Sequence, residues 1–236
     1  MISIVIPTYN EEKYIERCLK SLVNCKYEDY EIIIVDGNSS DSTLDIAKKY
    51  TNKILIEKKR EGIAPARNKG LKIAKGEIVA FLDADSIPCK GWIDIIMENF
   101  KQKYDVVYGP VYYGKWYDFY TKLRILLNFF EPILLKFFGD ISLIFFYLSG
   151  NNSAYKKELL KKVGGFPAVI CEDFALSKKL REIGAKMYFD RKMIVKLSSR
   201  RFKKIGFLKT LLIWCSADLN IILNNGKNSI SYRAIN

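Results

Sequence analysis

Residues 77–86 read EIVAFLDADS, an apolar run that ends abruptly at two aspartates separated by one alanine. Its almost continuous apolar character is typical of a strand that is covered on both faces of a sheet. Asp83 and Asp85 would then stand at the carboxyl end of a buried strand. Carboxylates in that position either form a turn or helix cap, or they bind a ligand.

Four further apolar runs are typical of strands, at residues 2–7, 31–36, 53–57 and 105–111. Helical patterns that begin with polar or proline residues alternate with these strands, at residues 11–24, 41–50, 64–75 and 90–102. This alternation predicts an α/β fold whose central, mostly parallel sheet is flanked by helices. In such a sheet the ligand lies at the carboxyl ends of the strands.

The chain has 236 residues, which is enough for one large α/β domain with appendages, and it contains no internal repeat. Its five cysteines lack the paired spacing of a zinc site, so we expect free thiols in a reducing compartment. Because residues 2–7 already form the first expected strand, we expect no signal peptide before the fold. These features together predict a cytoplasmic location.

Polar clusters follow the first, second and fourth strands, as PTYNEE at 7–12, DGNSSDST at 36–43 and DADS at 83–86. Their convergence at one edge of the sheet is a stronger signal than any one cluster, since Asp-x-Asp alone often ends a strand as a turn. As a ligand site, DADS predicts that Asp85 holds a divalent cation, Mg²⁺ or Mn²⁺, which completes its shell with water and substrate phosphates. Asp83 would meet the sugar or ribose of a ligand, or share the metal.

The second cluster contains two aspartates to which we assign different roles. Asp36 ends its strand, where a carboxylate can accept hydrogen bonds from a base or a ribose, so we predict ligand binding. For Asp41 we predict capping of the helix that follows.

In this order the segments resemble a family-2 glycosyltransferase of the GT-A fold, from about residue 2 to about residue 202. The resemblance is carried by IVIPTYNEEKYIERCLKSL (4–22), EIIIVDGNSSDST (31–43), EGIAPARNKGLKIAKGEIVAFLDADS (61–86), GNNSAYKKELLKKVGGF (150–166) and EDFALSKKLREIG (172–184). It implies a nucleotide-diphosphate sugar as donor, a divalent metal, and transfer to an acceptor with inversion. The GGF at 164–166 is expected to reverse the chain rather than to take part in chemistry.

The same resemblance assigns site residues. Donor contacts are implied for Pro7, Thr8, Tyr9, Glu11, Asp36, Arg67, Asp83, Arg200 and Arg201, and metal binding for Asp85 with Asp83. Arg67 would contact the donor diphosphate, because a guanidinium fork can share the charge that develops on the leaving group. Arg200 and Arg201 resemble a basic loop that closes over the diphosphate. The Gln-x-x-Arg-Trp pattern of processive enzymes is absent, which favours one transfer per acceptor.

An acceptor hydroxyl needs a general base, and the chain contains no histidine. By the resemblance Asp173 is this base, and Glu172 positions it or the acceptor. The alternative is that both carboxylates complement the positive end of the helix that they begin. Asn151 is expected to contact the acceptor. The absence of histidine also removes a metal ligand found in several related enzymes, so we expect the metal to be weakly held and exchangeable.

The net charge of +13 is concentrated in one part of the chain. Residues 151–210 contain 16 lysines and arginines against 5 acidic residues, whereas residues 1–150 contain 21 against 20. Such a basic block favours anionic partners, which include nucleic acid, an anionic membrane surface and phosphorylated substrates.

Two apolar segments are expected to form interfacial helices, at about residues 115–148 and 205–224. Charged residues interrupt both, so neither contains the roughly 20 apolar residues that cross a bilayer as a helix. We therefore divide the chain into a GT-A domain at 1–204, with an insertion at 115–148, and a C-terminal apolar helix and tail at 205–236. Peripheral attachment to the inner face of the cell membrane, with a polyprenyl-linked acceptor, would explain the charge and these helices. Packing on the domain or in a dimer is the alternative.

Two other classes of protein share some of these features. A nucleic-acid-binding protein would explain the charge, but the basic block contains no recognition module, so we expect no nucleic-acid partner. A nucleotidyltransferase could share the α/β core and the aspartates, yet PTYNEE stands where that class needs a glycine-rich phosphate loop. Release of pyrophosphate would favour that class, whereas release of a nucleoside diphosphate favours a glycosyltransferase.

Overall fold

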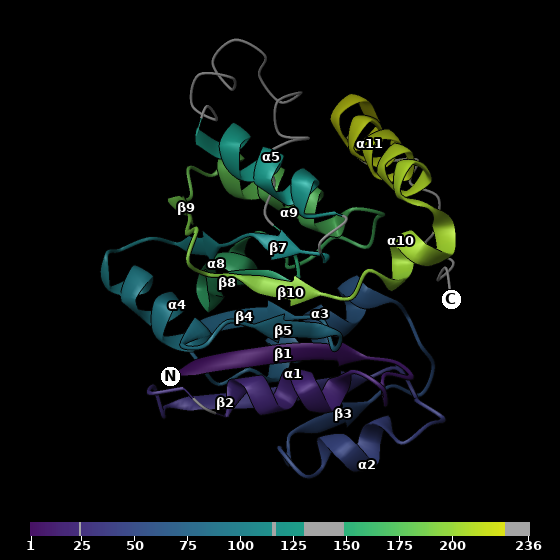
Figure 1. The fold of residues 1–236 in the computed structure, drawn as a ribbon. Helices are drawn as coiled ribbons and strands as arrows, with labels where there is room; N and C mark the ends of the chain where they lie inside the picture. Colours follow the sequence, from purple (N-terminus) through teal and green to yellow (C-terminus); the bar gives the residue numbers. More distant parts are fainter. Residues whose placement is uncertain (24, 115–116, 130–148, 225–236) are drawn as a thin grey trace.

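A seven-stranded sheet forms the centre of the computed structural model, which describes residues 1–23, 25–114, 117–129 and 149–224 (Figure 1). The spatial order is β3-β2-β1-β4-β8-β6-β9, and only β8 runs antiparallel to its neighbours. The strands are β1 (Ile2–Thr8), β2 (Tyr30–Asp36), β3 (Ile54–Ile56), β4 (Ile78–Leu82), β6 (Val106–Tyr108), β8 (Asn152–Lys156) and β9 (Met187–Phe189). The predicted α/β fold with a mostly parallel sheet is therefore confirmed.

Helices cover both faces of this sheet, because alternate side chains of each strand point to opposite faces. Ile2, Ile4 and Ile6 of β1 belong to one apolar core cluster, whereas Val5 of the same strand belongs to the other. The first cluster includes α1 (Ile15–Leu22), α2 (Thr43–Ala47) and α4 (Trp92–Lys101), and the second includes α3 (Ile63–Ile73), α8 (Lys157–Lys162) and α9 (Glu172–Glu182). Burial on both faces explains why the strands are almost continuously apolar.

The run at 105–111, predicted as one strand, is a strand of this sheet only in its first half, because the chain leaves the sheet in the middle of the run. β6 ends at Tyr108, and β7 (Val111–Tyr112) belongs to a second sheet of order β5-β10-β7, with β5 (Ser86–Pro88) and β10 (Val195–Leu197). A Cβ on Gly109 would lie 2.0 Å from the carbonyl oxygen of Met193, so the two backbones meet where only glycine fits. Pro110 follows and has no amide hydrogen for a strand ladder.

The predicted helices exist, but they are shorter than the patterns indicated. The helix expected at 11–24 begins only at Ile15. The amide of Glu11 donates to Thr43 Oγ1 at 2.7 Å, and this bond joins the segment before the helix to the start of α2. The expected chain reversal at 164–166 is present, with φ of 82° at Gly164 and 73° at Gly165.

Three helices lie beyond the small sheet, on one side of the molecule: α5 (Asp118–Phe129), α10 (Arg200–Ile205) and α11 (Phe207–Asn224) (Figure 1). They account for the described parts of the two apolar segments, whereas residues 115, 116, 130–148 and 225–236 lie outside the described residues. Ile221 of α11 packs against Phe174 and Ala175 of α9. No helix in the described part of the chain is long and apolar enough to cross a membrane.

Candidate active site

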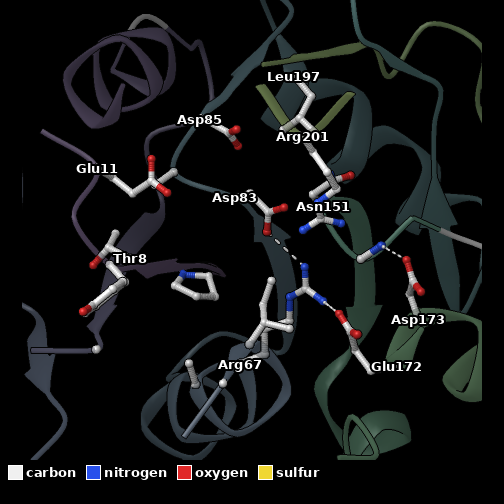
Figure 2. Close-up of a pocket in the computed structure, with 18 of the residues that line it drawn as sticks. Thr8, Glu11, Arg67, Asp83, Asp85, Asn151, Glu172, Asp173, Leu197 and Arg201 are labelled. Atoms are coloured by element: carbon white, nitrogen blue, oxygen red, sulfur yellow. Dashed lines mark hydrogen bonds and ion pairs between the residues drawn. The ribbon is translucent and has the colours of Figure 1, made fainter. Parts of the chain in front are cut away.

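A pocket of about 380 Å³ opens at the carboxyl ends of β1 and β4, next to the small sheet (Figure 2). Its volume lies within the range of small-molecule sites. All of the predicted site residues except Asp36 line it, namely Pro7, Thr8, Tyr9, Glu11, Arg67, Asp83, Asp85, Asn151, Glu172, Asp173, Arg200 and Arg201. The fold therefore brings together side chains that are up to almost 200 positions apart in sequence.

Asp36 is the predicted donor residue that the structure does not place in the pocket. Its carboxylate is fully buried, and it accepts hydrogen bonds from Thr8 Oγ1 at 2.8 Å and from the amide and hydroxyl of Ser39 at 2.7 Å each. This arrangement ties the loop after β2 to the end of β1. The buried contacts favour a positioning role over the predicted contact with a base or ribose.

Three carboxylates form the acidic side of the pocket: Glu11, Asp83 and Asp85. Burial, followed by the nearby charge of Asp83, raises the pKa of Asp85 to about 7. Burial also raises the pKa of Glu11, although Arg200 opposes that shift. Both shifts come first from burial, which disfavours the charged form of a carboxylate, and the charge of Asp83 adds to each of them.

Arg200, in the first turn of α10, reaches across the pocket to this acidic side. Its two terminal nitrogens contact the two carboxylate oxygens of Glu11 at 2.8 and 2.5 Å, and its Nε lies 3.1 Å from Asp85 Oδ2. The guanidinium also stands over the Tyr14 ring, 5.0 Å from its centre. Arg201 lies elsewhere, with its guanidinium 6.0 Å from the centre of the Trp214 ring.

Arg67, on α3, connects the acidic side to Glu172, the neighbour of the base predicted at the start of α9. Its Nη2 contacts Asp83 Oδ1 at 3.0 Å and its Nη1 contacts Glu172 Oε1 at 2.6 Å, and the side chain is only 2% exposed. A Cβ on Gly150 would lie 2.4 Å from Nη1, so this glycine leaves the space that the guanidinium occupies. With both terminal nitrogens paired, Arg67 is better placed to position Asp83 and Glu172 than to make the predicted diphosphate contact.

The two carboxylates predicted for catalysis have different environments. Burial raises the pKa of Glu172 to about 7, and the charge of Asp173 adds to this shift. The charge of Arg67 opposes the shift, but Arg67 also pairs with Asp83. Asp173 is half-buried and lines the pocket, and its Oδ2 accepts a hydrogen bond from the Gly150 amide at 3.2 Å. Figure 2 places Asp173 and Glu172 on one side, Glu11 and Asp85 on the other, and Asp83 and Arg67 between them.

Aromatic side chains that the sequence did not single out form another wall of the pocket. Tyr113, Phe202 and Trp214 line it, and their rings contact one another through Phe202, which lies 4.8 Å from Tyr113 and 5.8 Å from Trp214 between ring centres. Arg60 was also missed, and it stands 4.1 Å from the centre of the Tyr9 ring. No spacing or motif marks these residues. Tyr113, Phe202 and Trp214 come together through the small sheet, α10 and α11, whereas Arg60 lies between β3 and α3.

The chemistry of the acidic side fits a divalent cation. Carboxylate oxygens are the ligands that Mg²⁺ and Mn²⁺ favour. A cation would also offset the repulsion from Asp83, which adds to the larger effect of burial in raising the pKa of Asp85. Among the described residues, however, no three histidine, cysteine, aspartate or glutamate side chains are grouped so that they could hold a metal ion. A cation would therefore need ligands from the substrate or from water.

Comparison with known proteins identifies the family. The model of the Glycosyl transferase family 2 matches residues 3–164. The poly(ribitol-phosphate) beta-glucosyltransferase of Bacillus spizizenii is 52% identical over 92 residues, which are 36% of this chain and 14% of that protein. The chain spans less than half the length of the curated relatives that it matches here.

Two solved structures show the same fold. The mannosyltransferase PcManGT from Pyrobaculum calidifontis, in complex with GDP-Man and Mn²⁺, superposes with a TM-score of 0.67 at 22% identity and covers 95% of this chain and 70% of its own. Staphylococcus aureus TarS 1–349, in complex with UDP-GlcNAc, superposes with a TM-score of 0.63 at 24% identity and covers 84% of this chain and 58% of its own.

Proposed function

The chain belongs to glycosyltransferase family 2, and on this premise we propose that it transfers a sugar, with inversion, from a nucleotide-diphosphate donor to an acceptor hydroxyl or phosphate. The observation that carries this proposal is the convergence on one pocket of Asp83 and Asp85 with Asp173. The first pair suits the anionic part of a donor, and Asp173 suits the removal of a proton from an acceptor. We assign this chemistry to residues 1–204.

The donor binds along the ends of β1 and β4. Structural neighbours that bind UDP-GlcNAc and GDP-Man support this assignment. Tyr9, with Arg60 above its ring, offers a flat surface at which a base can stack. Arg200 and Arg201 supply positive charge for the diphosphate, while Arg67 holds Asp83 and Glu172 in place.

Asp85, with Asp83, would hold a Mg²⁺ or Mn²⁺ ion together with the donor diphosphate. Such an ion supplies Lewis-acid stabilisation of the charge that develops on the leaving diphosphate. The chain's own part is to place both carboxylates correctly. Arg67 does this for Asp83 through their 3.0 Å ion pair.

Asp173 acts as the general base. Its carboxylate accepts the proton of the acceptor hydroxyl, while the acceptor oxygen forms a bond to the anomeric carbon of the sugar. The bond from that carbon to the diphosphate oxygen breaks, and the nucleoside diphosphate leaves with the electron pair. The hydrogen bond from the Gly150 amide orients the carboxylate, and Glu172, buried against Arg67, fixes the start of α9.

We further propose that the acceptor is lipid-linked, such as a polyprenyl-linked sugar, and that the protein docks on an anionic membrane surface. Large exposed apolar side chains gather on α5 and α11, among them Phe119, Leu126, Leu208, Leu212 and Leu223. Lys203, Lys204 and Lys209 are exposed beside them, and the only acidic residue of α10 and α11, Asp218, is buried. The positive charge favours anionic lipid over a second copy of the same face, because a symmetric dimer would bring like charges together.

A donor screen tests the transferase assignment. Purified protein with Mn²⁺ or Mg²⁺ is offered UDP- and GDP-sugars, and release of the nucleoside diphosphate is measured. Asp173→Asn should lower turnover roughly 100- to 10,000-fold, the usual contribution of a general base. Asp45→Asn, an exposed carboxylate of α2, is the matched control and should behave as the wild type.

Three outcomes would contradict the proposal. The first is equal turnover of the wild type and Asp173→Asn with every donor that is accepted. The second is release of pyrophosphate from a nucleoside triphosphate, which would indicate a nucleotidyltransferase. For the metal, turnover that persists undiminished in excess EDTA would exclude the role assigned to Asp85.

A further inference from the structure

Arg200 uses the same oxygens that a cation on the acidic side would need. Both carboxylate oxygens of Glu11 contact its terminal nitrogens, at 2.8 and 2.5 Å, and Asp85 Oδ2 lies 3.1 Å from its Nε. One guanidinium therefore bridges two carboxylates that come from the ends of β1 and β4. It brings to the acidic side a positive charge from α10, a helix that lies far away in sequence.

A guanidinium and a divalent cation cannot both occupy this position. They carry like charges, which repel strongly at contact distance in a partly buried site. The Nε of Arg200 also lies 3.1 Å from Asp85 Oδ2, so the guanidinium already neutralises the oxygen that a cation at this position would contact. Binding of a cation by Asp85 thus requires that Arg200 first move away.

A diphosphate is the kind of group that can draw Arg200 away. A guanidinium binds phosphate oxygens through paired, charge-assisted hydrogen bonds, as it binds carboxylates. The Arg200 side chain is 45% exposed and stands in the first turn of a six-residue helix that follows directly after β10. It therefore has both access to an incoming ligand and a stem long enough to change partners within the pocket.

On the basis of the proposed function, we propose that Arg200 makes metal binding conditional on a diphosphate. In the free protein Arg200 neutralises Glu11 and Asp85 and competes with the cation. When a nucleoside diphosphate binds, the Arg200 guanidinium leaves the carboxylates and binds the phosphates of that ligand. The carboxylates that it leaves then bind the cation together with these phosphates. Arg200 is thus a specificity-determining residue, because a ligand with a single phosphate offers it less charge and fewer paired contacts.

Arg201 provides a matched control for this idea. It is the next residue on the same helix, lines the same pocket and carries the same charge, but its guanidinium lies over the Trp214 ring. Arg201→Gln therefore removes one positive charge from the pocket without removing the contact to Glu11 and Asp85. A comparison of the two arginines separates competition for the carboxylates from a general change in electrostatic potential.

The affinity for Mn²⁺ tests the proposal without any turnover. It is measured by electron paramagnetic resonance, in which the signal of the free ion decreases as the ion binds. With Mn²⁺ alone, Arg200→Gln should bind the ion at least tenfold more tightly than the wild type. The reason is that Arg200 leaves only a fraction of wild-type molecules open to the ion, and this fraction lowers the apparent affinity. The affinity of Arg201→Gln should stay within about threefold of that of the wild type. Arg200→Lys, which keeps the charge but loses the paired contacts, should fall between them. Asp85→Asn should abolish binding in every background.

Addition of UDP or GDP supplies the second half of the test. Wild-type affinity for Mn²⁺ should rise at least tenfold more with the diphosphate than with UMP or GMP, and this difference should shrink in Arg200→Gln. Equal Mn²⁺ affinities of Arg200→Gln and Arg201→Gln would overturn the proposal, as would an equal effect of mono- and diphosphate on the wild type. Either result would leave sugar transfer itself standing, whereas the donor screen decides that question independently.

Discussion

Glu172 shows how a single buried side chain links stability to pH. Burial raises the pKa of its carboxyl from 4.5 to about 7. The native state therefore keeps a proton at pH values where the unfolded chain has already lost it. The resulting stabilisation is complete below about pH 4.5, decreases as pH rises, and is gone above pH 7.

We expect the free energy of unfolding of the wild type, relative to that of Glu172→Gln, to fall by up to about 3 kcal/mol between pH 4.5 and pH 8. Urea unfolding at a series of pH values measures this difference. Glu158→Gln removes an exposed carboxylate of α8 and should leave the pH dependence of the wild type unchanged. A difference between the wild type and Glu172→Gln that rises with pH would show that the sign is wrong.

Site residues that a short local motif marks could be predicted from the sequence. The carboxylates after β1 and β4 and the Glu-Asp pair of α9 were found from sequence, and the structure places them around one pocket. The partners of these groups were not predictable. Arg67 was expected at a diphosphate, but the reversal at Gly164 and Gly165 brings Glu172 within 2.6 Å of it. No local pattern encodes a pairing across 105 positions.

The segment that joins α5 to β8 contains a glycine on which the site geometry depends. A Cβ at Gly150 would meet three atoms of the Arg67 guanidinium, the nearest at 2.4 Å, and the Gly150 amide also donates to Asp173. Gly150→Ala should therefore displace Arg67 together with its contacts to Asp83 and Glu172. We expect a loss of about 1–3 kcal/mol in the free energy of unfolding and a clear fall in sugar transfer.

Chemical denaturation and the nucleoside diphosphate assay measure the two effects. Gly184→Ala is the control: an added Cβ there meets nothing within 4 Å, although φ at this glycine is positive, at 71°, which Gly150 does not share. It should cost stability through backbone strain but leave transfer intact. If both variants lost the same activity, the role of Gly150 beside Arg67 would be refuted.

Elements whose own periodicity is strong were predicted correctly, and those made by tertiary contacts were not. Four of the five apolar runs and all four helical patterns each correspond to one element of the structure. The run at 105–111 is divided between two strands, because Gly109 and Pro110 pass the chain to a second sheet. That sheet consists of strands of two or three residues, which are too short to show a period of two.

The distribution of charge and apolar surface over the molecule predicts binding to anionic membranes. Liposome flotation should recover the protein with vesicles that contain phosphatidylglycerol and not with neutral phosphatidylcholine vesicles, and binding should weaken as salt increases. Leu212→Glu places a charge on the exposed face of α11 and should reduce binding at least tenfold. Ile73→Glu, at an exposed apolar position on α3, is the matched control.

Equal recovery with neutral and anionic vesicles would argue against the role of the lysines. Equal binding by Leu212→Glu and Ile73→Glu would exclude the α11 face as the docking surface. In either case the donor pocket is unaffected, because Leu212 does not line it.

The fold class, the order of the strands along the chain and the family could be inferred from sequence. Buried parallel strands need continuous apolar runs, and each polar cluster that follows a strand is a short, continuous stretch of sequence. Only the tertiary structure showed that Arg200 pairs with Glu11 and Asp85, that Arg67 is buried between two carboxylates, and that an aromatic wall lines the same pocket as Asp173. These contacts join segments that are far apart in the chain. Their geometry depends on how the two sheets and α10 pack, which no local sequence pattern specifies.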